Sequence, residues 1–371
     1  MGRTERNWSS SKGEAGGRAE FERGASVEQS RLSIGLRDVA RAAGVSTATV
    51  SRAINRPDIV SDELRTRISA VIDHLGWVPD GAARALATRR SGAVGAVFPT
   101  LSHGDFARAA TALQRELLAE NYILLLACSE YDPAQELRQV RKFLERGVDG
   151  MILVGHAHHA DLPGLLRRQR IPSINTFVFN RDDPTSSIGP DNHKALAELT
   201  EYLVKLGHIR FGVIGQSTTN NDRAAARLAG IRDALGRHGL AVRPMHWGEG
   251  LELSSVTEAR AIFRRIMKAS PRPTAILCAN AYLAVGAELE ALAMGLAVPG
   301  DVSIVGYDDT EVMSELPVPI TTVRVPGDEV GRRAARYILA QIFRRVHETV
   351  FECDAQIIVR ASSGPPPRRA K

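Results

Sequence analysis

The spacing of apolar residues changes along the chain and divides it into segments. Residues 1–34 have no apolar periodicity and are rich in Gly, Ser, Glu and Arg, which predicts a disordered arm. Residues 35–78 repeat apolar side chains at helical spacing, whereas from Gly92 onward short apolar runs alternate with amphipathic stretches. The pattern therefore predicts a small all-helical domain followed by a larger α/β domain.

The helical segment contains signals for helix starts and stops. Apolar positions 36, 39, 40 and 43 form one face of a first helix that ends at Gly44, and Ser46 is placed to cap a second helix over residues 47–54. Ser61 is placed to cap a third helix, which runs through Leu75. Two short helices joined at a glycine and braced by a third predict a helix-turn-helix.

The larger segment alternates strand and helix. Strand-like runs occupy residues 94–98, 122–127, 151–154, 210–214, 275–278 and 302–306, and helical stretches lie between them, including 106–119, 133–145, 194–206 and 224–235. Such alternation predicts parallel sheets with helices on both faces. There are too many units for one sheet, so we expect two lobes within residues 92–360. Lobe 1 covers 92–190 plus a segment near 325–350, lobe 2 covers 191–322 plus the last strand, and residues 361–371 form a basic flexible tail.

Composition narrows the class of protein. The net charge is +6, and the segment from Arg31 to Arg90 contains ten arginines but only six carboxylates. This basic N-terminal segment is suited to binding a polyanion. No apolar run reaches the roughly 18 residues that span a bilayer, and the first residues lack an apolar signal core. Cys128 and Cys278 lie in apolar runs and read as reduced core thiols. We expect a cytoplasmic protein without a membrane partner.

Two long motifs resemble the lactose-repressor (LacI) family of transcriptional regulators. They are residues 36–55, LRDVARAAGVSTATVSRAIN, and residues 298–309, VPGDVSIVGYDD. The resemblance runs in the same order from about Leu36 to Arg360. It implies a helix-turn-helix followed by a two-lobed domain like that of periplasmic binding proteins, with a hinge helix at residues 79–91 between them.

The second helix carries side chains suited to DNA. Arg52 can form two hydrogen bonds to guanine in the major groove, Thr47 offers a hydroxyl and a methyl, and Ala48 can contact a thymine methyl. In the family these positions read bases. Short hydrogen-bonding side chains suited to phosphates accompany them, namely Ser46, Thr49, Ser51 and Asn55.

The hinge segment adds a second predicted DNA contact. A short Ala-rich helix is marginal in water and can form when DNA supplies contacts. By resemblance, Ala83 and Leu86 contact DNA, with Leu86 wedged into a central base step from the minor groove. The family further implies a homodimer on a pseudo-palindromic double-stranded operator. The tail has no leucine heptads, which favours a dimer over a coiled-coil tetramer.

Polar residues after the strands predict a small-molecule site between the lobes. By resemblance, the ligand-binding positions are Phe106, Phe177, Asn221, Arg223, Arg227, Asn280 and Asp308. Phe177 stands where relatives often have an aspartate, and Ala281 where Asn-Asp is common. Fewer acids and two arginines leave a sugar or related metabolite, an anion and a partly aromatic molecule open as effectors.

Other function classes receive less support from the sequence. No dinucleotide, P-loop or nucleophile-elbow motif is present, so we predict no enzyme activity and no cofactor. The run His156-Ala157-His158-His159 lacks the spacing of a closed zinc site, so we predict no metal. The alternatives are a transport solute-binding protein, which needs an export signal and no DNA-binding head, and a DNA-architectural protein without ligand. We favour a regulator, with repression the commoner family behaviour, whose operator affinity an effector changes by shifting the lobes between two states.

Overall fold

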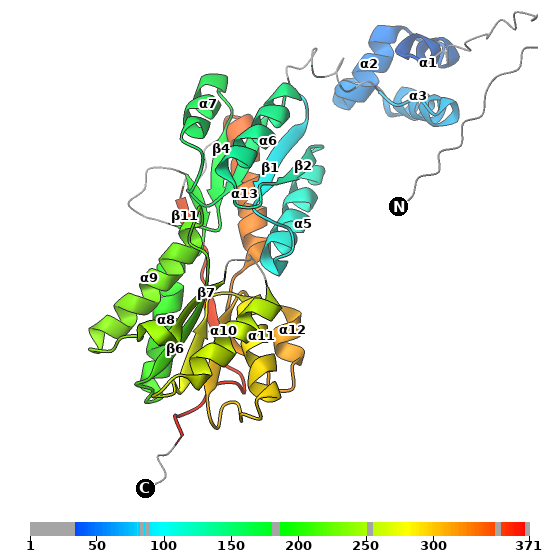
Figure 1. Cartoon of the computed structure of the whole chain (residues 1–371). Coiled ribbons are helices and arrows are strands. Elements are labelled where there is room, and N and C mark those ends of the chain that lie inside the picture. The colour runs from blue at the N-terminus through cyan, green and yellow to red at the C-terminus, as the bar shows by residue number, and fades with distance from the viewer. Residues whose placement is uncertain are drawn as a thin grey trace, which may run out of the picture. The chain divides into compact units, whose positions relative to one another are not determined.

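The computed structural model describes residues 34–79, 81, 85, 90–179, 186–250, 255–345 and 350–367. The chain divides into two compact units, Met1–Asp80 and Gly81–Lys371 (Figure 1). The predictions for residues 1–33, for most of the hinge segment with Ala83 and Leu86, and for residues 368–371 lie outside the described residues.

The first unit is the predicted helix-turn-helix. Its helices are α1 (Leu36–Ala42), α2 (Thr47–Asn55) and α3 (Asp62–Leu75), with a 3-10 turn at Pro57–Ile59. Gly44, at φ +66°, turns the chain between α1 and α2, and the Ser46 hydroxyl accepts a hydrogen bond from the Thr49 N–H at 3.1 Å. Ser61 occupies the N-cap position of α3, but its side chain makes no capping bond.

Lobe 1 of the second unit is built on a six-stranded parallel sheet. Its strand order is β11-β5-β4-β3-β1-β2. The strands are β1 (Ala93–Phe98), β2 (Ile123–Cys128), β3 (Gly150–Val154), β4 (Ser173–Thr176), β5 (Ser187–Gly189) and β11 (Val350–Glu352). Two helices, α5 (Gly104–Ala119) and α13 (Gly327–Ile342), pack together in one apolar cluster, while α6 (Pro133–Glu145) and α7 (Asp161–Gln169) share another.

Lobe 2 has a matching sheet in the order β12-β10-β9-β8-β6-β7. Its strands are β6 (Phe211–Gln216), β7 (Trp247–Gly250), β8 (Ala275–Cys278), β9 (Ser303–Tyr307), β10 (Thr321–Arg324) and β12 (Gln356–Ile358), and β12 alone pairs antiparallel. The helices are α8 (Asn192–Lys205), α9 (Asp222–Arg237), α10 (Val256–Lys268), α11 (Ala281–Ala293) and α12 (Glu311–Glu315), with a 3-10 turn at Pro244–His246. The predicted fold class, a helical head and a two-lobed α/β domain, is confirmed.

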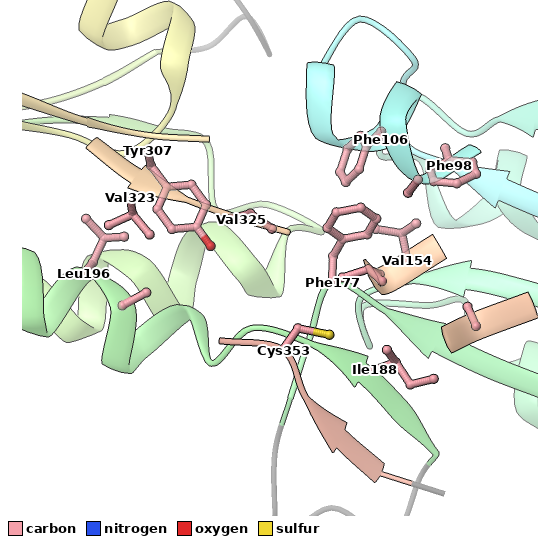
Figure 2. Close-up of a cluster of buried hydrophobic side chains, with 14 of the residues drawn as sticks. Phe98, Phe106, Val154, Phe177, Ile188, Leu196, Tyr307, Val323, Val325 and Cys353 are labelled. Atoms are coloured by element: carbon pink, nitrogen blue, oxygen red, sulfur yellow. The ribbon is translucent and has the colours of Figure 1, made fainter. Parts of the chain in front are cut away.

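The chain passes between the lobes after β5, after β10 and after β11. Figure 2 shows Phe106 and Phe177 on the lobe 1 side, Tyr307 and Val323 on the lobe 2 side, and Val325 between them. These side chains belong to one buried apolar cluster, so the cores of the two lobes are continuous at the crossings.

Two sequence expectations differ from the structure. The sequence predicts a flexible tail from residue 361, but Ser362 is buried, its hydroxyl accepts the Thr321 N–H at 2.8 Å, and the Gly364 carbonyl lies 2.8 Å from Nε2 of His208. Residues 362–364 therefore pack on lobe 2, because small serines satisfy backbone groups beside β10. Cys128 is only half-buried, since β2 is a sheet edge. Among the described residues, no helix is long and apolar enough to cross a membrane.

Candidate functional site

One face of α2 is open to solvent and the other is buried. Val50 and Ala53 pack into the core of the helical unit. Thr47, Ala48 and Arg52 are exposed, and they recur at the spacing of a single helical face. The predicted base-reading residues therefore stand together on the surface of their unit.

The short polar residues of α2 bond locally. The hydroxyls of Ser46 and Thr49 lie 2.8 Å apart, and Nδ2 of Asn55 donates to the Ser51 carbonyl at 3.0 Å. Within the described parts of the chain, the guanidinium of Arg52 makes neither a hydrogen bond nor an ion pair. Its five N–H donors are therefore available to an external acceptor.

A cavity of about 30 Å³ lies between the lobes, at the carboxyl ends of the strands. The predicted residues that line it are Phe106, Phe177, Arg223, Arg227 and Asp308. They come from α5, from the loop after β4, from α9 and from the loop after β9. The fold thus brings together side chains that are up to about 200 positions apart, as expected for a site at strand ends.

Asn221 and Asn280 do not line this cavity, because each side chain caps a helix. Oδ1 of Asn221 accepts the Ala224 N–H at 3.2 Å, and Oδ1 of Asn280 accepts the Leu283 N–H at 2.9 Å. Nδ2 of Asn280 also donates to Oε1 of Gln216 at 3.1 Å, so Asn280 orients a cavity residue from outside the cavity.

Sequence reasoning missed several polar and aromatic residues of the cavity, namely His103, Asp105, Tyr131, Asn192, Gln216 and Tyr307. A signal existed for some of them. Gln216 and Tyr307 are the last residues of β6 and β9, and ligands of parallel sheets bind beyond the carboxyl ends of the strands. Asn192 begins α8 just after a crossing, a position that only the tertiary fold identifies.

Arg227 lies at the centre of a buried network. Its guanidinium donates to Oδ1 of Asn192 at 3.0 Å and to Oε1 of Gln216 at 3.3 Å, and it stacks 4.6 Å from the centroid of the Tyr307 ring. The Tyr307 hydroxyl also donates to Oδ1 of Asn192, at 3.1 Å. Burial raises the pKa of Tyr307 to about 12, so the phenol stays neutral at pH 7.

Two carboxylates also line the cavity. One oxygen of Asp105 bonds to Arg108, and Asp308 lies 3.9 Å from Nδ1 of His103. The rings of Phe106 and Phe177 meet edge to face, with centroids 4.7 Å apart. The lining therefore offers a small molecule both polar groups and an aromatic surface.

Hydrogen bonds hold the lobes together at the rim of this cavity. The His156 N–H donates to Oδ2 of Asp222 at 2.8 Å, and the Tyr282 hydroxyl donates to the Ser102 carbonyl at 2.9 Å. A volume of about 30 Å³ is enough for about one water, whereas ligand pockets hold roughly 300 Å³ or more. The lobes must therefore separate before a metabolite can enter.

The histidines after β3 have structural partners. Nδ1 of His158 lies 2.9 Å from the Glu136 carboxylate, and its Nε2 lies 3.2 Å from Oδ1 of Asn175. Burial is the largest single influence and lowers the pKa of His158, but the hydrogen bonds to Glu136 and Asn175 and the nearby carboxylate charges together outweigh it, so the pKa is raised. Within the residues that the structure describes, no three metal-binding side chains gather in one place.

Comparison with known proteins matches both units. Residues 35–80 match the family model described as bacterial regulatory proteins, lacI family, and residues 200–363 match a periplasmic binding protein-like domain. The ribose operon repressor of Escherichia coli K12 is 30% identical over 313 residues, which span 83% of this chain and 92% of the relative. The repressor PurR of Aliivibrio salmonicida is 27% identical over 88% of this chain and 98% of its own length.

Solved structures of transcriptional regulators are similar to this chain. A LacI family transcriptional regulator from Silicibacter pomeroyi superposes with a TM-score of 0.80 at 25% identity, covering 89% of this chain and 99% of the other. The lac repressor dimer bound to operator and the anti-inducer ONPF gives a TM-score of 0.79 at 25% identity with the same coverage. These relatives are transcriptional regulators and not enzymes. The chain belongs to the lacI family of bacterial regulatory proteins.

Proposed function

We propose that this regulator binds a pseudo-palindromic operator as a homodimer, and that a small metabolite enclosed between its lobes sets its affinity for that DNA. The observation that carries the proposal is the exposed face of α2, where the guanidinium of Arg52 has no hydrogen-bond or ion-pair partner in the described part of the chain. A guanidinium in this position is suited to the two acceptors of guanine in the major groove.

The residues of α2 divide into two roles. Thr47, Ala48 and Arg52 read base edges, because they point outward from the middle of the exposed face. Ser46, Thr49, Ser51 and Asn55 fix the helix on the phosphates, since short hydroxyl and amide groups carry little sequence information there. The segment 79–91 acts as a hinge helix that inserts Leu86 into the central base step.

An exposed apolar edge on lobe 1 supports the homodimer. Leu118 on α5 is 65% exposed, and Ile123 and Leu126 on the edge strand β2 are 58% and 42% exposed. Apolar side chains gathered on a sheet edge are typical of a surface that another subunit covers. A second copy of the chain, related by a twofold axis, would place two reading helices on the two half-sites.

The effector acts on the equilibrium between open and closed lobes. Separation of the lobes breaks the rim bonds at Asp222 and Tyr282, and a ligand that bridges the two lobes restores closure. β10 and β12 belong to lobe 2, whereas α13 and β11 belong to lobe 1, so closure moves the chain crossings after β10 and after β11. Because α13 packs on α5, the movement is passed to the exposed apolar edge of lobe 1. The protein works in the cytoplasm, where its DNA partner lies.

Selection of bound duplexes from a random pool at near-physiological salt tests the proposal. A recovered palindrome with two half-sites supports a dimeric regulator, and a metabolite that changes the affinity for that palindrome supports the sensor. Equal, salt-sensitive binding to every duplex would reject sequence-specific recognition by α2.

A further inference from the structure

Arg227 is a buried cation whose protein partners are all neutral. The residue is 7% exposed, its Nη atoms donate to the amide oxygens of Asn192 and Gln216, and its Nε has no hydrogen-bond partner. Among the described residues, no carboxylate lies within ion-pair distance of Arg227. Because an unpaired buried charge is unfavourable, this arrangement is better suited to a bound anion than to the closed protein by itself.

The charged neighbours of Arg227 in the cavity have other partners. Arg223 bonds to Oδ1 of Asp222 at 3.0 Å, and Asp105 bonds to Arg108. Asp308 lies 3.9 Å from Nδ1 of His103, a contact that is an ion pair only when the imidazole is protonated. One guanidinium without a counter-charge balances a monoanionic carboxylate, whereas a phosphate monoester carries nearly two charges at pH 7.

Two residues that line the cavity have hydrogen-bonding atoms without a partner. Gln216, on lobe 2, is oriented by two donors to its Oε1, from Arg227 and Asn280, so its buried Nε2 is left as a donor without a partner beside Arg227. Asp105, on lobe 1, has a buried Oδ2 that is an acceptor without a partner. Lobe 2 therefore presents donors to the cavity through Arg227 and Gln216, and lobe 1 presents an acceptor through Asp105.

We propose that the effector is a small hydroxy acid. Its carboxylate accepts hydrogen bonds from Arg227 and Gln216, and its hydroxyl groups donate to Asp105 and Asp308 across the ring pair of Phe106 and Phe177. Arg108 already bonds to Asp105, so Asp105 takes a neutral hydroxyl donor and not a further cation. This inference rests on the proposed function, because it names the chemical class that the sensor cavity recognises.

Calorimetric titration of the full-length protein with matched acid and neutral probes tests the inference. The pairs are D-gluconate with sorbitol and D-glucuronate with D-glucose, and glucose 6-phosphate tests a phosphate in place of the carboxylate. We expect at least one acid to bind at least about 10-fold more tightly than its neutral partner and than the phosphate. A neutral probe or the phosphate binding as tightly as the acids, or no acid binding below about 10 mM, would overturn the inference.

Variants of Arg227 test whether this residue causes the preference for acid probes over neutral probes. Arg227→Gln should weaken acid binding by about 10- to 100-fold and the neutral probes by less than about 3-fold, while Arg227→Lys should retain part of the preference for acids. Arg232→Gln is the matched control, because Arg232 is an exposed arginine on the same helix and stacks on Trp247 away from the cavity. An unchanged acid preference in Arg227→Gln would assign the carboxylate to another residue and reject the inference.

Operator binding separates this inference from the proposed function. Circular dichroism checks that Arg227→Gln is folded, and Arg232→Gln is expected to bind the selected palindrome in the absence of probe like the wild type. A protein that binds the palindrome and responds to a neutral sugar would reject the hydroxy-acid class alone. A protein that recognises no palindrome would reject the proposed function as well.

Discussion

Glu288 is predicted to make the second unit less stable as the pH rises toward neutrality. Its side chain, on α11, is 0% exposed, and one oxygen accepts the Val318 N–H at 3.2 Å while the other has no partner. Burial raises the pKa from its ordinary value of 4.5 to about 7, although the hydrogen bond from Val318 opposes this rise. The native state therefore keeps a proton that the unfolded chain has already lost.

The sign and size of the effect of Glu288 on stability follow from proton linkage. Below pH 4.5 the carboxyl is protonated in both states and has no effect on stability. Between pH 4.5 and about 7 only the unfolded chain ionises, so stability falls as the pH rises, and above about 7 the penalty is constant. A pKa difference of this size corresponds to at most about 3 kcal/mol.

Glu288→Gln should remove this penalty while keeping an acceptor for the Val318 N–H. We expect the variant to match the wild type near pH 4.5 and to gain up to about 3 kcal/mol at pH 8, measured by urea unfolding monitored by circular dichroism. The same gain at both pH values would refute the reasoning, because it would then come from packing and not from ionisation.

Glu290 on the same helix is the matched control. Its carboxylate bonds to Arg264 at 2.6 Å and to Arg260 at 2.9 Å, and the hydrogen bond from Arg264, ahead of that from Arg260, lowers its pKa. The stabilisation from this pair is present above the unfolded pKa and is lost as the pH falls. Glu290→Gln should therefore destabilise the protein at pH 8 and have a smaller effect near pH 4, opposite to Glu288→Gln.

Further predictions concern DNA recognition. Arg52→Ala should lose discrimination at one base position by about 1–3 kcal/mol, measured against a set of singly changed operators, and equal weakening on all of them would mean that Arg52 contacts only phosphate. Ser46→Ala removes the cap of α2 and should cost the helical unit about 1 kcal/mol in thermal unfolding, whereas Ser46→Asp should retain most of it. Leu86→Ala should weaken binding to the palindrome far more than to random duplex, and equal losses would reject a wedge at the central step.

The helical unit could be predicted closely because its signals are local. The four apolar positions of α1, the turn at Gly44 and the capping hydroxyl of Ser46 lie within a few residues of the backbone they shape. The short strands β4, β5 and β7 were not predicted. The strands β1, β2, β3, β6, β8 and β9 were predicted, since parallel strands buried on both faces form short apolar runs in the sequence. Their ends shifted by one or two residues, as at β6, where Gln216 continues the strand.

The residues that line the cavity could be predicted only in part. Arg223, Arg227, Phe106, Phe177 and Asp308 line it, and their positions were expected from the resemblance. Asn221 and Asn280 have the same side chain and similar places after strands, but each is the first residue before a helix, so its oxygen is used by the backbone. Which polar group remains free for a ligand depends on the exact start of the helix.

The amino-acid sequence by itself determined the helices of the first unit, the alternation of strands and helices in the second, the exposed face of α2 and the two-lobed class, because these depend on spacing and on capping within short segments. Only the tertiary structure decided that Asn192, Gln216 and Tyr307 surround Arg227 without a carboxylate among the described residues. It also decided that Ser362 and Ser363 pack beside Thr321 of β10. The reason is that hydrogen-bond partners and burial arise from segments far apart in the chain, and no local pattern records which of them meet.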